Sequence, residues 1–268
     1  MADVIMEAAP IAEAGPSRRD QLVDTFTSYR QQLDLENERR ERLIILSRSI
    51  TQQSKKVIFH LHRCATLPGT PAFDKNIQTA RTMVQKIVES FAQVSAELRD
   101  TSDAESYWRW YRNISPGLEE FIESISFLHY LEHRQLITCQ EIQNTLKEEG
   151  PDDTLVVVTP DDFILGISDL TGELMRFATN ALSTGDAETP QEICAFVRNI
   201  KTYFDGIPTH HLRQLSKKQE ETTRSLMKIE KLCYETQLRS IEYDGRRDVL
   251  AQMSRRDVEG YRDQPIEV

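Results

Sequence analysis

Two pairs of carboxylates border apolar helical stripes, where a core-facing helix normally carries neutral side chains. Asp169 and Glu173 lie four residues apart in TPDDFILGISDLTGELMRFATNALS, and Glu120 and Glu123 lie three residues apart in GLEEFIESISFLHYL. On a helix, either spacing places both side chains on one side, where like charges repel by about 0.2–0.5 kcal/mol. Each pair therefore calls for a compensating positive charge.

The sequence leaves two kinds of compensation open. Arg176, three residues after Glu173, could form an ordinary surface ion pair. Alternatively, two helices packed side by side could converge their carboxylate oxygens on one hard cation, Mg²⁺ or Mn²⁺. A di-iron carboxylate site is set aside, because that architecture uses Glu-x-x-His and this pattern does not occur in the sequence.

The helix that must position Asp169 and Glu173 has a complete start signal. Thr159 suits the N-cap, Pro160 suits the first helical position, and Asp161 and Asp162 place negative charge on the first turn. Apolar residues then recur at three- and four-residue steps, which predicts one buried face; they are Phe163, Ile167, Leu170, Leu174, Phe177 and Ala181.

Similar periodicity and few glycines and prolines predict an all-α fold of long helices. The predicted helices cover residues 22–63, 73–98, 105–135 with a kink or a new start at Pro116, 138–150, 159–183, 189–206 and 209–238. Thr138 and Thr189 each open an expected capping box. We expect a mobile segment over residues 1–21, a helical domain over 22–243 and a charged, mobile tail over 244–268.

The net charge, the apolar runs and the cysteine spacing of the sequence argue against several classes of function and location. A net charge of −10 argues against a chain that grips nucleic acid unaided, because such affinity comes mostly from Lys and Arg on phosphates. The sequence has no apolar run near 18 residues, no signal-peptide pattern and no Cys-x-x-Cys. We expect a soluble protein of the cytoplasm that contacts no membrane; Ser17-Arg18-Arg19 leaves nuclear import open.

Basic residues on the first predicted helix are either an ordinary solvated face or an RNA contact; they are Arg39, Arg40, Arg48, Lys55 and Lys56. Trp108 and Trp110, interleaved with arginines, could stack on RNA bases, although packing or a protein interface is the commoner use of such side chains. The bulky Trp108, Trp110 and Phe127 also suggest more apolar surface than one layer of helices can cover.

Three stretches together resemble the translin superfamily, on the side of the translin-associated factors rather than translin itself. They are LGISDLTGELMRFATNALSTGDAETP, RLIILSRSITQQSKKVIFHLHR and GLEEFIESISFLHYL, and the resemblance runs from about Phe26 to Leu238. It implies a seven-helix bundle with long antiparallel helices. It also implies a hollow hetero-octamer with translin that acts as a Mg²⁺-dependent endoribonuclease on single-stranded RNA.

The resemblance assigns the catalytic carboxylates to the associated-factor subunit, at Glu120, Glu123 and Asp169, with Glu173 supporting the metal directly or through water. The resulting hypothesis is metal-assisted phosphodiester hydrolysis, active in complex with translin. No histidine general base is evident near these motifs. The alternative is a non-enzymatic helical subunit that stabilises an RNA-binding translin partner, with its acids engaged only in surface ion pairs.

Overall fold

The computed structural model describes residues 17–63, 70–99, 106–148, 154–183 and 186–242. In these ranges the chain forms seven α-helices and no strand, which confirms the predicted all-α class. The helices are α1 (Arg18–His62), α2 (Pro71–Arg99), α3 (Ser106–His133), α4 (Cys139–Glu148), α5 (Pro160–Ser183), α6 (Glu188–Phe204) and α7 (Leu215–Glu242). The expected mobile segment over residues 1–21 overlaps the described chain at residues 17–21, where α1 already begins at Arg18. Its remainder, residues 1–16, and the tail 244–268 lie outside the described ranges.

The chain divides into two compact units, Met1–Arg42 and Leu43–Val268. The described part of the first unit is almost wholly the beginning of α1, and it presents exposed apolar side chains such as Phe26 and Tyr29. The second unit holds the rest of α1 and the other six helices. The carboxylate cluster and the groove described below belong to the second unit.

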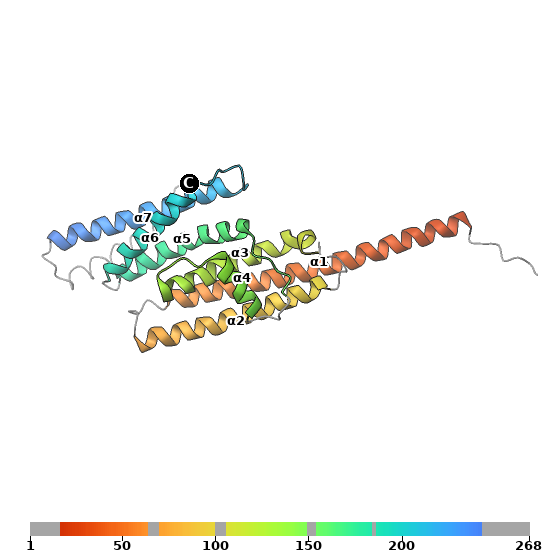
Figure 1. The fold of residues 1–268 in the computed structure, drawn as a ribbon, viewed down its shortest axis with the longest axis horizontal. Helices are drawn as coiled ribbons and strands as arrows, with labels where there is room; N and C mark the ends of the chain where they lie inside the picture. The colour runs from red at the N-terminus through yellow and green to blue at the C-terminus, as the bar shows by residue number, and fades with distance from the viewer. Residues whose placement is uncertain (1–16, 64–69, 100–105, 149–153, 184–185, 243–268) are drawn as a thin grey trace, which may run out of the picture. The chain divides into compact units, whose positions relative to one another are not determined.

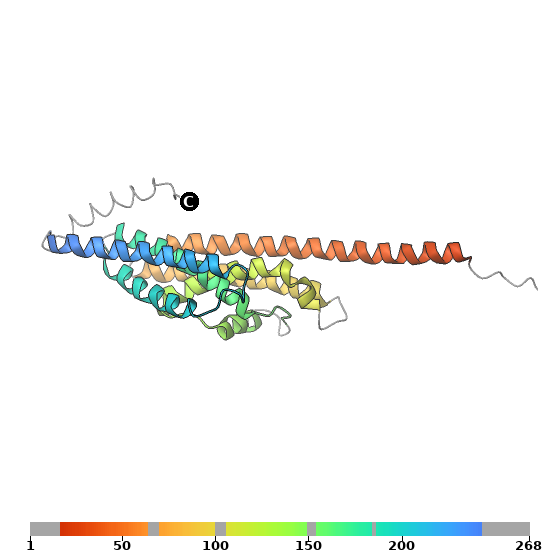
Figure 2. The same cartoon turned by 90° about the horizontal axis from the view of Figure 1, so that it is seen from above.

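Within the second unit, α3 and α5 are the central helices (Figures 1 and 2). Helix α3 packs on α2 and on α5, and α5 packs in turn on α6 and α7. The consecutive helices α2 and α3 run antiparallel, as their colour gradients in Figure 1 show. Because α3 and α5 carry the two acidic pairs, this arrangement places the pairs on neighbouring helices.

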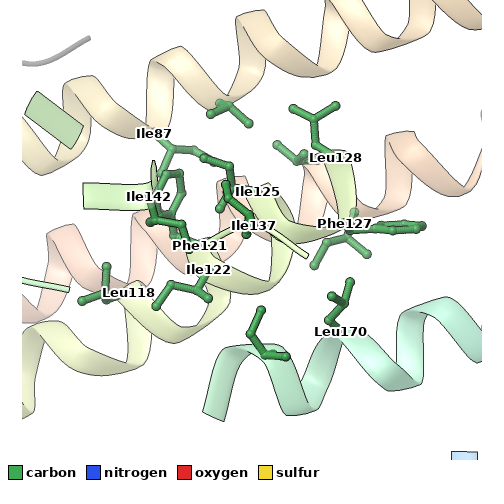
Figure 3. Packing of buried hydrophobic residues seen from close by; sticks show 14 of the residues in the cluster. Ile87, Leu118, Phe121, Ile122, Ile125, Phe127, Leu128, Ile137, Ile142 and Leu170 are labelled. Atoms are coloured by element: carbon green, nitrogen blue, oxygen red, sulfur yellow. The ribbon is translucent and has the colours of Figure 1, made fainter. Parts of the chain in front are cut away.

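The core is built around α3, whose apolar side chains point toward several neighbouring elements (Figure 3). Ile87 comes from α2, Ile142 from α4 and Leu170 from α5, and all three are buried against this helix. Burial of such side chains contributes about 1.5–3 kcal/mol each relative to exposure. The α3 residues in this cluster include Leu118, Phe121, Ile122, Ile125, Phe127 and Leu128.

Two of the bulky aromatic residues expected to be uncovered belong to this core. Trp110 and Phe127 are 7% and 0% exposed, so the expectation of uncovered surface is wrong for both. Phe127 packs edge-on against Phe177 of α5, with ring centroids 5.8 Å apart. Trp108 remains 60% exposed.

Helix α3 continues through Pro116 rather than starting again there. Proline removes one helical N–H and disturbs the turn before it. Close contact with α1 accompanies the defect: the Gly117 N–H donates to Ser47 Oγ at 3.2 Å. A Cβ on Gly117 would stand 2.9 Å from the Ser47 carbonyl oxygen, so glycine allows this approach of the two helices.

The helix starts follow the predicted caps at two of three positions. Thr159 Oγ1 accepts the Asp162 N–H at 3.1 Å, and at Thr138 the side chain and backbone N–H exchange bonds with Glu141. The capping box at Thr189 is wrong, because α6 begins one residue earlier. Asp186 Oδ1 accepts the N–H groups of Glu188 and Thr189 there instead.

None of the helices in the described ranges is long and apolar enough to cross a membrane.

Candidate active site

The acidic pairs are brought together by a close approach of α5 to α3. Gly166 of α5 lies against α3, and a Cβ at this position would stand 2.7 Å from Ile122 Cγ2 and 2.9 Å from the Glu119 carbonyl oxygen. No larger residue fits there without a shift of backbone. The contact point is adjacent in sequence to Glu120 and about one turn before Asp169, so it sets the separation of the carboxylates.

Glu123 shows the effect of this convergence most clearly. Its side chain is buried, and burial raises its pKa to about 8, assisted by the negative charges of Asp169, Glu173 and Glu120. A carboxyl responds in this way when several like charges surround it in a poorly solvated place. All four acidic residues predicted from the sequence are therefore electrostatic neighbours.

Glu119 and Asp162 extend the acidic region toward the start of α5. Burial raises the pKa of Glu119, and Asp162 and Asp169 add to the effect. Asp162 is fully buried and accepts hydrogen bonds from Ser115 Oγ at 2.6 Å and from Tyr111 Oη at 2.9 Å. Because its oxygens are engaged in these bonds and in the cap, Asp162 serves to anchor α5 against α3.

Three of the four predicted carboxylates have a cationic or imidazole partner from another helix. Lys55 Nζ of α1 lies 3.2 Å from Glu120 Oε1, and Lys218 Nζ of α7 lies 2.5 Å from Asp169 Oδ1. His62 Nε2 of α1 donates to Glu173 Oε2. Although burial acts to lower the pKa of Lys218, its bond to Asp169 and the neighbouring acids raise it overall.

The predicted pairing of Glu173 with Arg176 is present but loose, at 3.9 Å, and the Arg176 side chain is 62% exposed. An exposed pair of this kind contributes about 0–1 kcal/mol. The positive charge near these acids therefore comes mainly from helices distant in sequence. With Glu120, Asp169 and Glu173 engaged in this way, the described residues contain no group of three His, Cys, Asp or Glu side chains already arranged around a metal position.

Two residues at the site were missed by the sequence analysis. His62 contacts Glu173 across 111 residues, and nothing in the spacing of the sequence indicates this contact. Its ring lies 5.1 Å from that of Phe127, so it is part of the packed core next to the acids. Lys218 belongs to a helix that was predicted from the spacing of its apolar residues alone, and this spacing says nothing about its lysines. A half-buried basic side chain opposite an acidic pair leaves no periodic signal in a single sequence.

The basic residues predicted to bind RNA have mixed positions. Arg39 and Arg40 belong to the first unit, and Arg48, Lys55 and Lys56 belong to the second. Arg40, Arg48, Lys55 and Lys56 are exposed. Of these residues, Lys55 contacts the acidic cluster, through its ion pair with Glu120.

A groove of about 710 Å³ opens beside Glu173 and His62. It is lined by the end of α1 with Arg63, by the second half of α5 and by the middle of α7. Its lining includes the basic side chains Arg63, Arg176, Lys228 and Lys231. Substrate or cofactor sites have volumes of about 300–1,000 Å³, so this groove is large enough to hold a ligand next to the carboxylates.

The fold and this site define a class: an all-α bundle in which two central helices place paired carboxylates in a partly buried cluster. Comparison with known proteins identifies the family. The Translin family profile matches residues 38–240. The chain therefore belongs to the Translin family.

The similar family members include Translin-associated protein X as well as Translin itself. Rat Translin-associated protein X is 34% identical over 235 residues, covering 81% of this chain and 79% of the relative. The Schizosaccharomyces pombe homologue of Translin-associated protein X is 26% identical, covering 82% of this chain and 90% of the relative. Chicken Translin is 25% identical over 72% of this chain and 86% of its own length.

Solved structures share the fold. The crystal structure of AfC3PO has a TM-score of 0.59 at 19% identity, covering 81% of this chain and 99% of that chain. The complex of AfC3PO with duplex RNA has a TM-score of 0.58 at 17% identity, covering 81% and 98%.

Proposed function

We propose that this chain is the catalytic subunit of a hetero-oligomeric endoribonuclease formed with translin, a hetero-octamer that hydrolyses phosphodiester bonds of single-stranded RNA with Mg²⁺ or Mn²⁺. The observation that carries the proposal is the close approach of α5 to α3 at Gly166, which gathers the acidic pairs around the buried Glu123. The similarity to Translin-associated protein X and the RNA complex of a structural neighbour support RNA as the substrate class.

The proposal of a hard divalent cation rests on the chemistry of the side chains, because the described residues hold no group of three already arranged around a metal position. Carboxylate oxygens are the ligands that Mg²⁺ prefers, and Glu123 forms no ion pair among the described residues although three other acids surround it. Glu120, Glu123 and Asp169 would hold the metal, and Glu173 would support it directly or through water. When bound, Mg²⁺ would supply an acidified water and neutralise charge on the phosphate oxygens.

The chain's own residues prepare this arrangement. His62, bonded to Glu173 and packed against Phe127, holds one carboxylate in a fixed orientation. Lys218 balances the charge of Asp169 from α7. A carboxylate of the cluster or the solvent would take up the proton of the attacking water. His62 Nδ1 is buried, and Nε2 is bonded to Glu173, so no ring nitrogen of His62 is placed to act as a general base.

The decisive experiment measures cleavage of a labelled single-stranded RNA by the full-length chain, alone and co-expressed with translin, in Mg²⁺ and in EDTA. The proposal predicts cleavage by the co-expressed complex in Mg²⁺ and its loss in EDTA. An inactive complex that still binds RNA would instead support the non-enzymatic subunit, whose acids serve only the three contacts with Lys55, Lys218 and His62.

A further inference from the structure

We propose that the groove beside Glu173 is the subsite for an unpaired nucleotide next to the cleaved phosphate, with Phe59 stacking on the base and Arg63 and Lys228 contacting the backbone. The inference rests on the proposed function and adds to it the position of one nucleotide of the substrate and the residues that would hold it. None of these three residues is among the five basic residues named as candidate RNA contacts from the sequence, Arg39, Arg40, Arg48, Lys55 and Lys56.

Continuity with the carboxylates is the first argument. Glu173 and His62 line the groove and also belong to the candidate active site. A chain whose phosphate sits at Asp169 and Glu123 therefore has its neighbouring nucleotide at the groove. At about 710 Å³ the groove lies within the size range of pockets that hold small molecules.

Charge is the second argument. The chain carries a net charge of −10, yet basic side chains from three elements gather at this groove. Arg176 pairs only loosely with Glu173, and Lys231 lies 3.8 Å from Glu235. Arg63 and Lys228 are exposed. A local cluster of this kind supplies the positive potential that a polyanion requires on an acidic protein.

The apolar part of the groove is the third argument and selects the kind of RNA. Phe59 is 63% exposed although it lies on α1 beside the buried Ile58 and close to His62. Leu232 and Met175 contribute further apolar surface to the lining. Unpaired bases stack on such exposed aromatic rings, whereas bases inside a duplex have their faces covered by each other. The groove therefore favours single-stranded over duplex RNA.

Binding is measured by fluorescence anisotropy in EDTA, which prevents metal-dependent cleavage, on the full-length chain alone and co-expressed with translin. The probes are a fluorescein-labelled 12-nucleotide polyuridine and a labelled 12-base-pair RNA duplex. Phe59→Ala should weaken binding of the single strand roughly 5- to 100-fold and change duplex binding far less. Phe59→Tyr, which keeps an aromatic face, should restore it.

A second test removes positive charge from the groove by combining Arg63→Glu with Lys228→Glu. Loss of two phosphate contacts should lower the slope of log affinity against log salt by about 1.4. The matched control combines Lys75→Glu with Lys86→Glu, two exposed lysines of α2 outside the groove, and should change the slope much less. Wild-type affinity in the groove variants, or a loss no larger than in the control, would overturn the inference.

Three outcomes show how this inference and the proposed function stand or fall separately. If the complex cleaves RNA and Asp169→Asn abolishes cleavage while the groove variants bind as wild type, the subsite is wrong and the catalytic assignment stands. If the groove variants lose co-purification with translin instead of RNA affinity, the groove is a protein interface and the inference fails. If the groove variants lose RNA affinity but the wild type never cleaves, the subsite stands and the catalytic function fails.

Discussion

Glu123 combines deep burial with three acidic neighbours, and this makes its charge state depend on pH in the physiological range. Its pKa is raised from 4.5 to about 8. A carboxyl with a higher pKa in the folded state favours folding at low pH, below its unfolded pKa, and this contribution is lost as the pH rises through the folded pKa. The relevant window therefore runs from about pH 4.5 to about pH 8.

The first prediction follows from the direction in which the contribution of Glu123 to stability changes with pH. In EDTA, the wild-type free energy of unfolding should contain a falling contribution across that window, on the order of a few kcal/mol. Glu123→Gln should remove it and become more stable than wild type at pH 8. Glu89→Gln makes the same chemical change at an exposed position of α2 and should keep the wild-type pH dependence. Parallel curves for Glu123→Gln and wild type in urea unfolding would refute the environment assigned to Glu123.

The acids themselves were predictable because they interrupt apolar stripes, and a charge in such a position stands out against helical periodicity. Their partners were not. Lys218 meets Asp169 across 49 residues and His62 meets Glu173 across 111, and such pairings depend on the packing of whole helices. Arg176 was within reach in sequence, yet its side chain is mostly exposed and contacts Glu173 only at 3.9 Å.

At the scale of elements, the approach of α5 to α3 at Gly166 decides whether the two acidic pairs meet. Gly172, also on α5, provides the opposite environment, because nothing lies within 4 Å of the position of its absent Cβ. The two glycines thus differ in whether an added methyl group would push the helices apart.

The second prediction uses this difference. Gly166→Ala should destabilise the protein by about 1–3 kcal/mol, since Ile122 and the α3 backbone have no room to give, and it should lower RNA cleavage by separating the carboxylates. Gly172→Ala should instead stabilise it by about 0.5–1 kcal/mol, because alanine is the better helix former. Thermal unfolding of both variants checks the result, and equal effects at the two sites would contradict the close approach.

Helices were the most predictable elements, and their ends were less so. Thr159 and Thr138 cap as expected because each carries its acceptor and its reciprocal acid at the right spacing. The same pattern at Thr189 was misleading, since Asp186 offered an earlier acceptor. At Pro116 the sequence could not decide between a kink and a new helix, because the answer depends on Ser47 of α1, which bonds to the Gly117 N–H.

At the scale of the whole molecule, exposed apolar side chains remain after the helices have packed. Trp108, Tyr203 and Tyr234 of the second unit are 60%, 81% and 68% exposed, while the first unit presents Phe26 and Leu33. Large exposed apolar groups of this kind mark protein interfaces when they are contiguous. Under the proposed function, a partner would cover this apolar surface and add positive potential to a chain of net charge −10.

The third prediction concerns that partner. Expressed alone, the chain should aggregate or bind single-stranded RNA weakly; co-expressed with translin, it should form a soluble hetero-oligomer with RNA affinity at least about tenfold higher. Sedimentation velocity and RNA titration measure both properties on the same samples. A well-behaved monomer that cleaves RNA unaided would contradict the partnership while leaving the carboxylate site intact.

The central claim, that the α3–α5 carboxylates catalyse RNA cleavage, is tested most directly by Asp169→Asn in the translin complex. The change removes one charge at nearly constant volume, and an asparagine oxygen can still accept from Lys218. Asp161→Asn, at an exposed position in the first turn of α5, is the matched control. With a labelled single-stranded RNA in Mg²⁺, the account predicts a loss of at least about 100-fold in cleavage for Asp169→Asn, with assembly unchanged and the control active. Wild-type cleavage by an intact Asp169→Asn complex would contradict it.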